Sequence, residues 1–280
     1  MNKRGLILDL DNTLYNWVDA FLPSFRAMIH KLSHELSIEE EEILDDFRDV
    51  YLKHGTVEYP RAVNELTLWD RNKISDKERK RISEIVDKVF SINYRSHLRL
   101  FPNVREVLMW TREEGIPVIG LSDALERWVC YRLRILGIEK YFAGLYTWQH
   151  DQWFDDRHPH HSSIKTRVQL NSNELKPNLE VVNRVLADFS LNRETTFMVG
   201  DSLSKDIAVA QTAGVNDVWA RYGTRPHELN LNTLRRITPW SESEKAKEKN
   251  AKLHIVPTFI IDDFHELIGL IGTRRPKLFD

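Results

Sequence analysis

Short apolar runs alternate with helical patterns over most of the chain. Six runs are short and apolar enough for buried strands, at residues 4–8, 117–124, 143–147, 195–201, 217–223 and 258–262. Three helical patterns each stop at a glycine, at 103–114, 125–136 and 207–213, and two more helices are expected after Pro177 and after the last strand. Because strands and helices alternate, we expect an α/β fold with a doubly wound parallel sheet and helices on both faces.

Residues 16–98 interrupt this alternation with helical patterns alone. Apolar side chains recur at intervals of three and four from Trp17 to Leu36, in a stretch where Pro23 can kink a helix. Two serine–glutamate pairs have the spacing of capping boxes and predict the starts of two further helices: Ser37 with Glu40, and Ser75 with Glu78. We therefore expect two domains, a core at 1–15 and 99–280 and an α-helical cap at 16–98.

Two polar stretches, 148–175 and 224–254, are expected to be irregular surface segments. The first contains a group of histidines and aspartates that could bind zinc: His150, Asp151, Asp155, Asp156, His158, His160 and His161. Their spacing matches no tight ligand motif, so a polar surface loop is the favoured interpretation. Its aromatic residues are either packing anchors, which we favour, or a wall for a substrate: Trp148, Trp153 and Phe154.

Composition narrows the class of protein. The 280 residues include 40 basic and 42 acidic side chains, with a net charge of −2, so a nucleic-acid-binding or membrane-binding surface is not expected. The single cysteine, Cys130, allows no internal disulfide and fits a reducing, cytoplasmic setting. No apolar run approaches the ~20 residues of a membrane span.

Polar side chains follow three of the predicted strands, at the point where each strand ends. Asp9 and Asp11 follow the first strand, Ser122 and Asp123 end the second, and Asp201 ends the fourth. The carboxyl ends of parallel strands meet at one edge of the sheet. Any one of these strand ends could be a solvated turn, but acids at several of them favour a site. On extended chain, Asp9 and Asp11 point to the same side.

Four segments of the chain resemble, in order, the four motifs of the haloacid dehalogenase (HAD) superfamily: DLDNTL, GLSD, ELKPN and GDSLSKDI. The resemblance covers residues 1–16, 99–147, 174–222 and 256–270 and favours the phosphoglycolate phosphatase-like branch. It implies a Rossmann-like core with a helical cap inserted after the first motif.

The resemblance implies distinct roles for the two neighbouring acids. Asp9 would be the nucleophile that forms an aspartyl-phosphate, and Asp11 would protonate the leaving oxygen and then activate water. A Mg²⁺ ion would be held by the Asp9 side chain, the Asp11 backbone carbonyl and the Asp201 side chain. The dehalogenases that gave the superfamily its name have no second aspartate, so Asp11 favours phosphoryl transfer.

The resemblance also implies groups that bind the phosphate. Ser122 and the backbone amide of Asp123 would hold the phosphoryl oxygens. Thr13, through its hydroxyl, and the amides near Asn12 would shape the loop around the phosphate. Ser122 could equally cap the helix that follows it.

A lysine completes the expected site. Lys176 would offset negative charge on the nucleophile and the transferring group, and the proline after it favours it over its competitor Lys165. Asp206 is expected either to support the site, by orienting Lys176 or a metal-bound water, or to serve as a structural partner; Ser202 is a further supporting residue.

These expectations favour a Mg²⁺-dependent phosphatase that acts on a small soluble phosphorylated metabolite. Two alternatives stay open: a phosphomutase of the same superfamily, and a non-catalytic regulatory or binding protein on this scaffold. The specificity residues are expected on the cap helices, and no motif there names a substrate.

Overall fold

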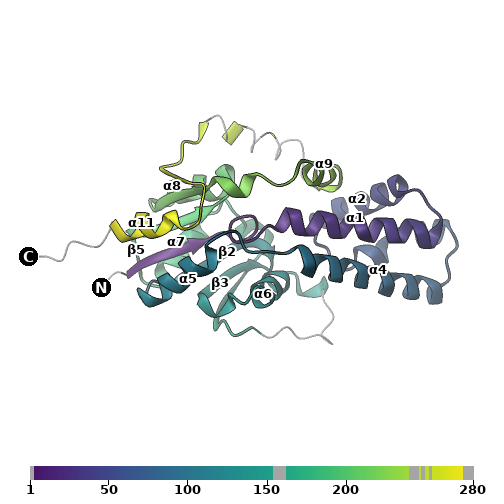
Figure 1. Cartoon of the computed structure of the whole chain (residues 1–280), viewed down its shortest axis with the longest axis horizontal. Coiled ribbons are helices and arrows are strands. Elements are labelled where there is room, and N and C mark those ends of the chain that lie inside the picture. Colours follow the sequence, from purple (N-terminus) through teal and green to yellow (C-terminus); the bar gives the residue numbers. More distant parts are fainter. Residues whose placement is uncertain (1–2, 154–161, 240–245, 247–249, 252–253, 274–280) are drawn as a thin grey trace, which may run out of the picture.

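A parallel β-sheet forms the centre of the molecule (Figure 1). The computed structural model describes residues 3–153, 162–239, 246, 250–251 and 254–273. Within them the sheet has seven strands, which lie side by side in the order β4 (Thr166–Leu170), β3 (Phe142–Trp148), β2 (Val118–Leu125), β1 (Lys3–Leu8), β5 (Leu191–Gly200), β6 (Asn216–Ala220) and β7 (Phe259–Ile261). All six pairings are parallel, which confirms the expected α/β class.

The strand order reverses at β1. From β1 the chain first adds β2, β3 and β4 on one side, and then crosses back to add β5, β6 and β7 on the other. In an open parallel sheet, ligands bind at the carboxyl ends of the strands where this order reverses. The residues that follow β1 therefore lie where a ligand is expected.

Helices cover both faces of the sheet, as a doubly wound fold requires. Helices α7 (Leu179–Asp188) and α8 (Ala208–Ala213) pack on one face, and the other face carries α5 (Val104–Glu113), α6 (Glu126–Ile135) and α11 (Glu266–Thr273). Strand β1 contributes to both layers, because Ile7 packs with α7 and α8 whereas Leu6 and Leu8 belong to the opposite cluster.

Residues 16–98, called the helical block below, extend away from one end of the sheet (Figure 1). The block consists of α1 (Trp17–Leu36), α2 (Glu40–His54), the 3₁₀ turn η1 (Ala62–Glu65), α3 (Leu68–Arg71) and α4 (Asp76–His97). Helices α1 and α4 lie side by side, and α1 continues through Pro23. The expected helical content is confirmed. No helix in the described part of the chain is both long and apolar enough to cross a bilayer.

Of the two serines predicted to cap helices, one is the N-cap of its helix, and the prediction for the other is wrong. Ser75 caps α4 as expected, because its hydroxyl accepts a hydrogen bond from the Glu78 amide at 3.3 Å. Ser37 instead ends α1 in the left-handed conformation, with φ of 54°, and α2 begins after Glu39 without a side-chain cap. Ser37 is the C-cap of α1, and its amide donates to the Ser33 carbonyl.

Both polar stretches contain regular structure that the sequence analysis missed. Strand β4 lies at the sheet edge with only Leu170 fully buried, so it has no apolar run. Helix α9 (Glu228–Ile237) packs on α1 and α2 of the helical block, and its buried residues are Asn230 and Ile237. Asn230 accepts a hydrogen bond from Arg26 and donates one to Asp19, each at 2.7 Å. These contacts explain why a polar segment forms a helix here.

The described chain also contains five short helical turns, and two of them change the predicted bounds of a strand and a helix. The five turns are η2 (Glu139–Tyr141), η3 (Asp151–Trp153), η4 (Ser172–Glu174), the π-helical turn η5 (Leu203–Ile207) and η6 (Arg221–Thr224). The strand expected at 217–223 ends at Ala220, where η6 begins, and the helix expected at 207–213 is preceded by η5.

Candidate active site

Asp9 lies directly after β1, at the carboxyl edge of the sheet. Its backbone amide donates to the Val199 carbonyl of β5 at 2.9 Å, which extends the strand pairing and fixes its position. Its side chain is buried, and the residue is 6% exposed. Two strands flank β1: Ser122 lies in the second half of β2, three residues before its end, and Asp201 directly follows β5. The sheet therefore brings the three strand ends together.

Lys176 reaches Asp9 from the segment before α7. Its ammonium group donates to Asp9 Oδ1 and to Asp206 Oδ1, the latter at 2.6 Å, and the residue is 8% exposed. Lys165, its competitor in the sequence, is exposed. Of these two lysines, the structure places Lys176 against the Asp9 carboxylate.

Burial and charge act against each other in this pair. Burial raises the pKa of Asp9 to about 7, although the neighbouring ammonium group of Lys176 lowers it. Burial by itself lowers the pKa of Lys176, but the carboxylates of Asp206 and Asp9 outweigh this effect and raise that pKa well above its usual value. Lys176 therefore stays protonated and provides the positive charge that an ionised Asp9 needs.

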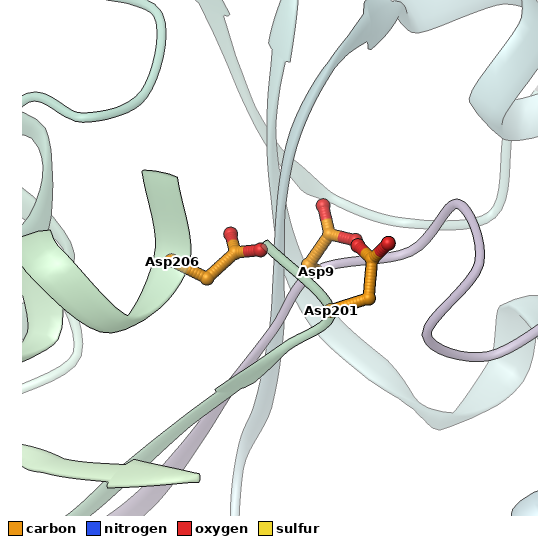
Figure 2. Close-up of side chains that lie close together, drawn as sticks. All are labelled: Asp9, Asp201 and Asp206. Carbon is orange, nitrogen blue, oxygen red and sulfur yellow. The ribbon is translucent and has the colours of Figure 1, made fainter. Parts of the chain in front are cut away.

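Three carboxylates gather at this edge (Figure 2). Asp9, Asp201 and Asp206 each place one oxygen within 4.8 Å of the others. Both oxygens of Asp206 already have partners, since Oδ1 accepts from Lys176 and Oδ2 accepts from the Ser202 amide at 3.0 Å. The two oxygens of Asp9 also have partners, since Oδ1 accepts from Lys176 and Oδ2 accepts from the Thr13 hydroxyl. Asp9 and Asp201 lie beside each other in Figure 2, and their carboxylate oxygens are the kind of ligand that Mg²⁺ prefers. Asp206 orients Lys176.

The loop after β1 folds back on the Asp9 side chain. Asn12 adopts the left-handed conformation, with φ of 59°, and its side chain accepts from the Val18 amide at 3.1 Å, in the first turn of α1. The Thr13 hydroxyl donates to Asp9 Oδ2 at 3.0 Å. Tyr222 of η6 donates to the Thr13 carbonyl at 2.7 Å. Both residues predicted to shape this loop therefore make hydrogen bonds that hold its form.

Asp11 has a different cation from Asp9. Its two carboxylate oxygens accept hydrogen bonds from Nη1 of Arg132 in α6, at 2.9 and 3.2 Å. The sequence analysis missed Arg132. The signal lay in the helix pattern, because Arg132 falls on the buried face of α6 beside Val129 and Leu133.

The polar residues of β2 make structural contacts around the site. Ser122 is buried, and its hydroxyl accepts from the Ala124 amide at 3.2 Å. The Asp123 carboxylate accepts from the Lys176 amide at 2.9 Å and from the Lys205 ammonium group at 2.8 Å. Burial raises the pKa of Asp123, but the charges of Lys205 and Lys176 hold it below its usual value. Asp123 thus fixes the backbone that carries Lys176.

The aromatic residues after β3 act as packing anchors. The Trp153 ring stacks on His150, with centroids 3.8 Å apart, and meets Tyr59 of the helical block edge-on at 5.1 Å. Trp148 also packs edge-on against Trp153, at 5.4 Å. Asp151 begins the turn η3. The other candidate zinc ligands and Phe154 lie outside the described residues: Phe154, Asp155, Asp156, His158, His160 and His161.

Gly223 of η6 is in close contact with the loop that carries Asp11 and Asn12. A Cβ atom at this position would lie 1.9 Å from the Asn12 carbonyl oxygen, and backbone cannot yield cheaply. We expect Gly223→Ala to lower the free energy of unfolding by about 1–3 kcal/mol, measured by urea denaturation. Gly269→Ala in α11 is the matched control, because a Cβ there meets nothing within 4 Å. Equal stability of the two variants would contradict the close approach.

Comparisons with known proteins agree with this geometry. The haloacid dehalogenase-like hydrolase family model matches residues 3–214, and a HAD-hydrolase-like model matches 175–267. A glyceraldehyde 3-phosphate phosphatase of Methanopyrus kandleri is 25% identical over 224 residues, which are 79% of this chain and 84% of that protein. A Clostridium perfringens protein named as a pyrophosphatase is 27% identical over 234 residues, 80% of this chain and 87% of that protein.

A solved structure shares the fold. It is a HAD-hydrolase of Bacillus subtilis with bound magnesium, 14% identical, with a TM-score of 0.53 over 97% of this chain and all of that one (100%). The first family model covers more than half of the 280 residues. The protein therefore belongs to the haloacid dehalogenase-like hydrolase family.

Proposed function

We propose that this protein is a Mg²⁺-dependent phosphomonoester hydrolase that acts through an aspartyl-phosphate intermediate. The observation that carries the proposal is the buried Asp9 carboxylate, which has the Lys176 ammonium group on one oxygen and the Asp201 carboxylate beside it. A carboxylate that attacks a phosphate meets another anion, so it needs positive charge at close range. Lys176 supplies one such charge, and Asp9 with Asp201 offers ligands for a second.

In the first step, an oxygen of Asp9 attacks phosphorus as the bond from phosphorus to the substrate oxygen breaks. The departing oxygen takes a proton from Asp11, which acts as the general acid. Lys176 stabilises the negative charge shared between Asp9 and the transferring group. The products are a free alcohol and phosphorylated Asp9.

In the second step, Asp11 takes a proton from water, and the resulting hydroxide attacks phosphorus. The bond between phosphorus and Asp9 breaks, which releases inorganic phosphate and restores the carboxylate. A Mg²⁺ ion on Asp9 and Asp201 would offset the charge of the phosphoryl oxygens. Ser122, whose hydroxyl accepts from the Ala124 amide, and the Asp123 amide complete the phosphate site in this proposal.

The substrate class is inferred from the relatives and from the position of the helical block. One relative is named for a triose phosphate and the other for pyrophosphate, so a small soluble phosphorylated compound is the shared feature. We propose that residues 16–98 form a cap over the site, since Glu58 of this block is bonded to Arg132, the partner of Asp11.

We expect the protein, supplied with Mg²⁺, to release inorganic phosphate from p-nitrophenyl phosphate and from members of a panel of sugar, triose and nucleoside monophosphates. Chelation with EDTA should abolish release, and added Mg²⁺ should restore it. Asp201→Asn should raise the Mg²⁺ concentration for half-maximal rate by roughly 10-fold or more, because a charged ligand is lost. Asp70→Asn, at an exposed position of the helical block, should leave that concentration unchanged.

Three outcomes would contradict this function. Absence of phosphate release from every compound with Mg²⁺ present would remove the hydrolase proposal. An isomeric phosphate as the product, with little free phosphate, would identify a phosphomutase. Tight binding of a phosphate compound without turnover would favour a non-catalytic protein.

A further inference from the structure

Arg132 of α6 joins three separate parts of the molecule through its guanidinium group. Nη1 donates to both oxygens of Asp11, at 2.9 and 3.2 Å. Nη2 donates to Glu58, in the segment between α2 and η1 of the helical block. Nε donates to the Tyr94 hydroxyl of α4 at 2.8 Å. Every nitrogen of the group therefore has its own partner, and each partner comes from a different segment.

Burial makes this arrangement rigid. The side chains of Arg132, Glu58 and Asp11 are 3%, 11% and 21% exposed, so two anions share one desolvated cation. The donors of a guanidinium group are planar and fixed in direction, so the group cannot turn toward one acid without losing the other. Loss of a contact would leave a buried charge without its partner, which is strongly unfavourable.

Glu58 is itself fixed from both sides of the junction between the helical block and the core. Its Oε1 accepts from Trp17 Nε1 of α1 at 2.9 Å. Its backbone carbonyl accepts from Trp128 Nε1 of α6 at 3.0 Å. The residue that binds Nη2 of Arg132 is therefore held by the helical block through its carboxylate and by the core helix α6 through its backbone.

Asp11 needs such a partner, because the sheet does not orient it. Strand β1 ends at Leu8, and the chain turns at Asn12, which is left-handed. A guanidinium group is a donor only, so it can hold Asp11 without taking the proton that Asp11 transfers. A carboxylate has about four acceptor positions, and Arg132 occupies two of those on Asp11.

We propose that Arg132 is a positioning residue for proton transfer by Asp11, and that Glu58 links this orientation to the seating of the helical block. The inference rests on the proposed phosphatase function and deepens it by adding residues outside the four motifs. Arg132 acts on both steps in which Asp11 moves a proton, and kcat/KM reports the first of them, protonation of the leaving oxygen. Attack by Asp9, held by Lys176 and Thr13, does not depend on Arg132.

The test compares two substrates that differ in their need for a proton. p-Nitrophenolate leaves as a stable anion, whereas the alkoxide of glycerol phosphate must be protonated as it leaves. We expect Arg132→Gln to lower kcat/KM for glycerol phosphate by roughly 100-fold, and for p-nitrophenyl phosphate by less than about 5-fold. Asp11→Asn should show the same preference. The Mg²⁺ concentration for half-maximal rate should not change in Arg132→Gln.

Two further variants keep the test decisive. Arg132→Lys retains the buried charge but cannot serve three partners, so it should fold and show an intermediate loss of roughly 10-fold on glycerol phosphate alone. If Arg132→Gln does not fold, the kinetics of Arg132→Lys on the two substrates test the positioning role instead. Arg134→Gln changes an exposed arginine of the same helix and should match wild type on both substrates.

The outcomes separate this inference from the proposed function. If wild type hydrolyses both esters and the Arg132 variants lose kcat/KM equally on both, or lose none, the positioning role is wrong and the phosphatase stands. If wild type with Mg²⁺ hydrolyses neither ester nor any compound of the panel, the proposed function fails, and this inference fails with it.

Discussion

Asp9→Asn is expected to lower the turnover of every phosphate monoester substrate by about four orders of magnitude or more, because an amide cannot act as the attacking group. The fold should persist. An asparagine oxygen can still accept from the Thr13 hydroxyl, and Lys176 keeps its contact with Asp206. Burial already raises the pKa of Asp9 to about 7, so a neutral group is tolerated at this position. Steady-state kinetics with Mg²⁺ and thermal unfolding measure the two effects.

A direct check looks for the covalent intermediate. Wild type quenched with acid during turnover should carry one added phosphoryl group in the peptide that contains Asp9, detected by mass spectrometry. Asp9→Asn should carry none, and Asp70→Asn should behave as wild type because it alters an exposed acid far along the sequence. Substantial turnover in Asp9→Asn, or a phosphoryl group on another residue, would show that the nucleophile is wrongly assigned.

The parts of the fold that follow from apolar burial could be predicted from the sequence. Strands β1, β2 and β5 are apolar runs because helices cover both of their faces. Strand β4 could not be found in this way, since it lies at the sheet edge and buries Leu170 alone. Helix α9 was missed for a related reason: only Asn230 and Ile237 are buried, and polar contacts help to hold the helix on the helical block.

Some residues of the candidate site could likewise be predicted from the sequence, and others could not. Strand ends must meet at one edge of a parallel sheet, so the proximity of Asp9 and Asp201 follows from topology alone. The partner of Asp11 does not, because Arg132 lies 121 residues further along the chain, on a helix rather than at a strand end. The sequence places Arg132 on an otherwise apolar face of α6, which indicates that its charge is buried. This pattern does not indicate which acid pairs with it.

Lys176→Met is expected to have the second-largest effect, because it removes the ammonium group between Asp9 and Asp206. Both carboxylates are buried, and without the lysine they face each other with no cation between them. Turnover should fall by roughly 100- to 1,000-fold, as for loss of one group that stabilises charge in the transition state. The free energy of unfolding of the metal-free protein should fall by about 3–5 kcal/mol, as when one partner of a buried ion pair is removed.

A double variant separates the two losses. Lys176→Met combined with Asp206→Asn removes the cation together with one of the two acids it serves, so much of the lost stability should return. Turnover should stay low, because Asp9 still has no ammonium group beside it. Lys165→Met is the matched control, since Lys165 is exposed, and it should be close to wild type in both measurements. Normal turnover in Lys176→Met together with a large loss in Lys165→Met would reverse the assignment. Full recovery of turnover in the double variant would show that Lys176 serves folding alone.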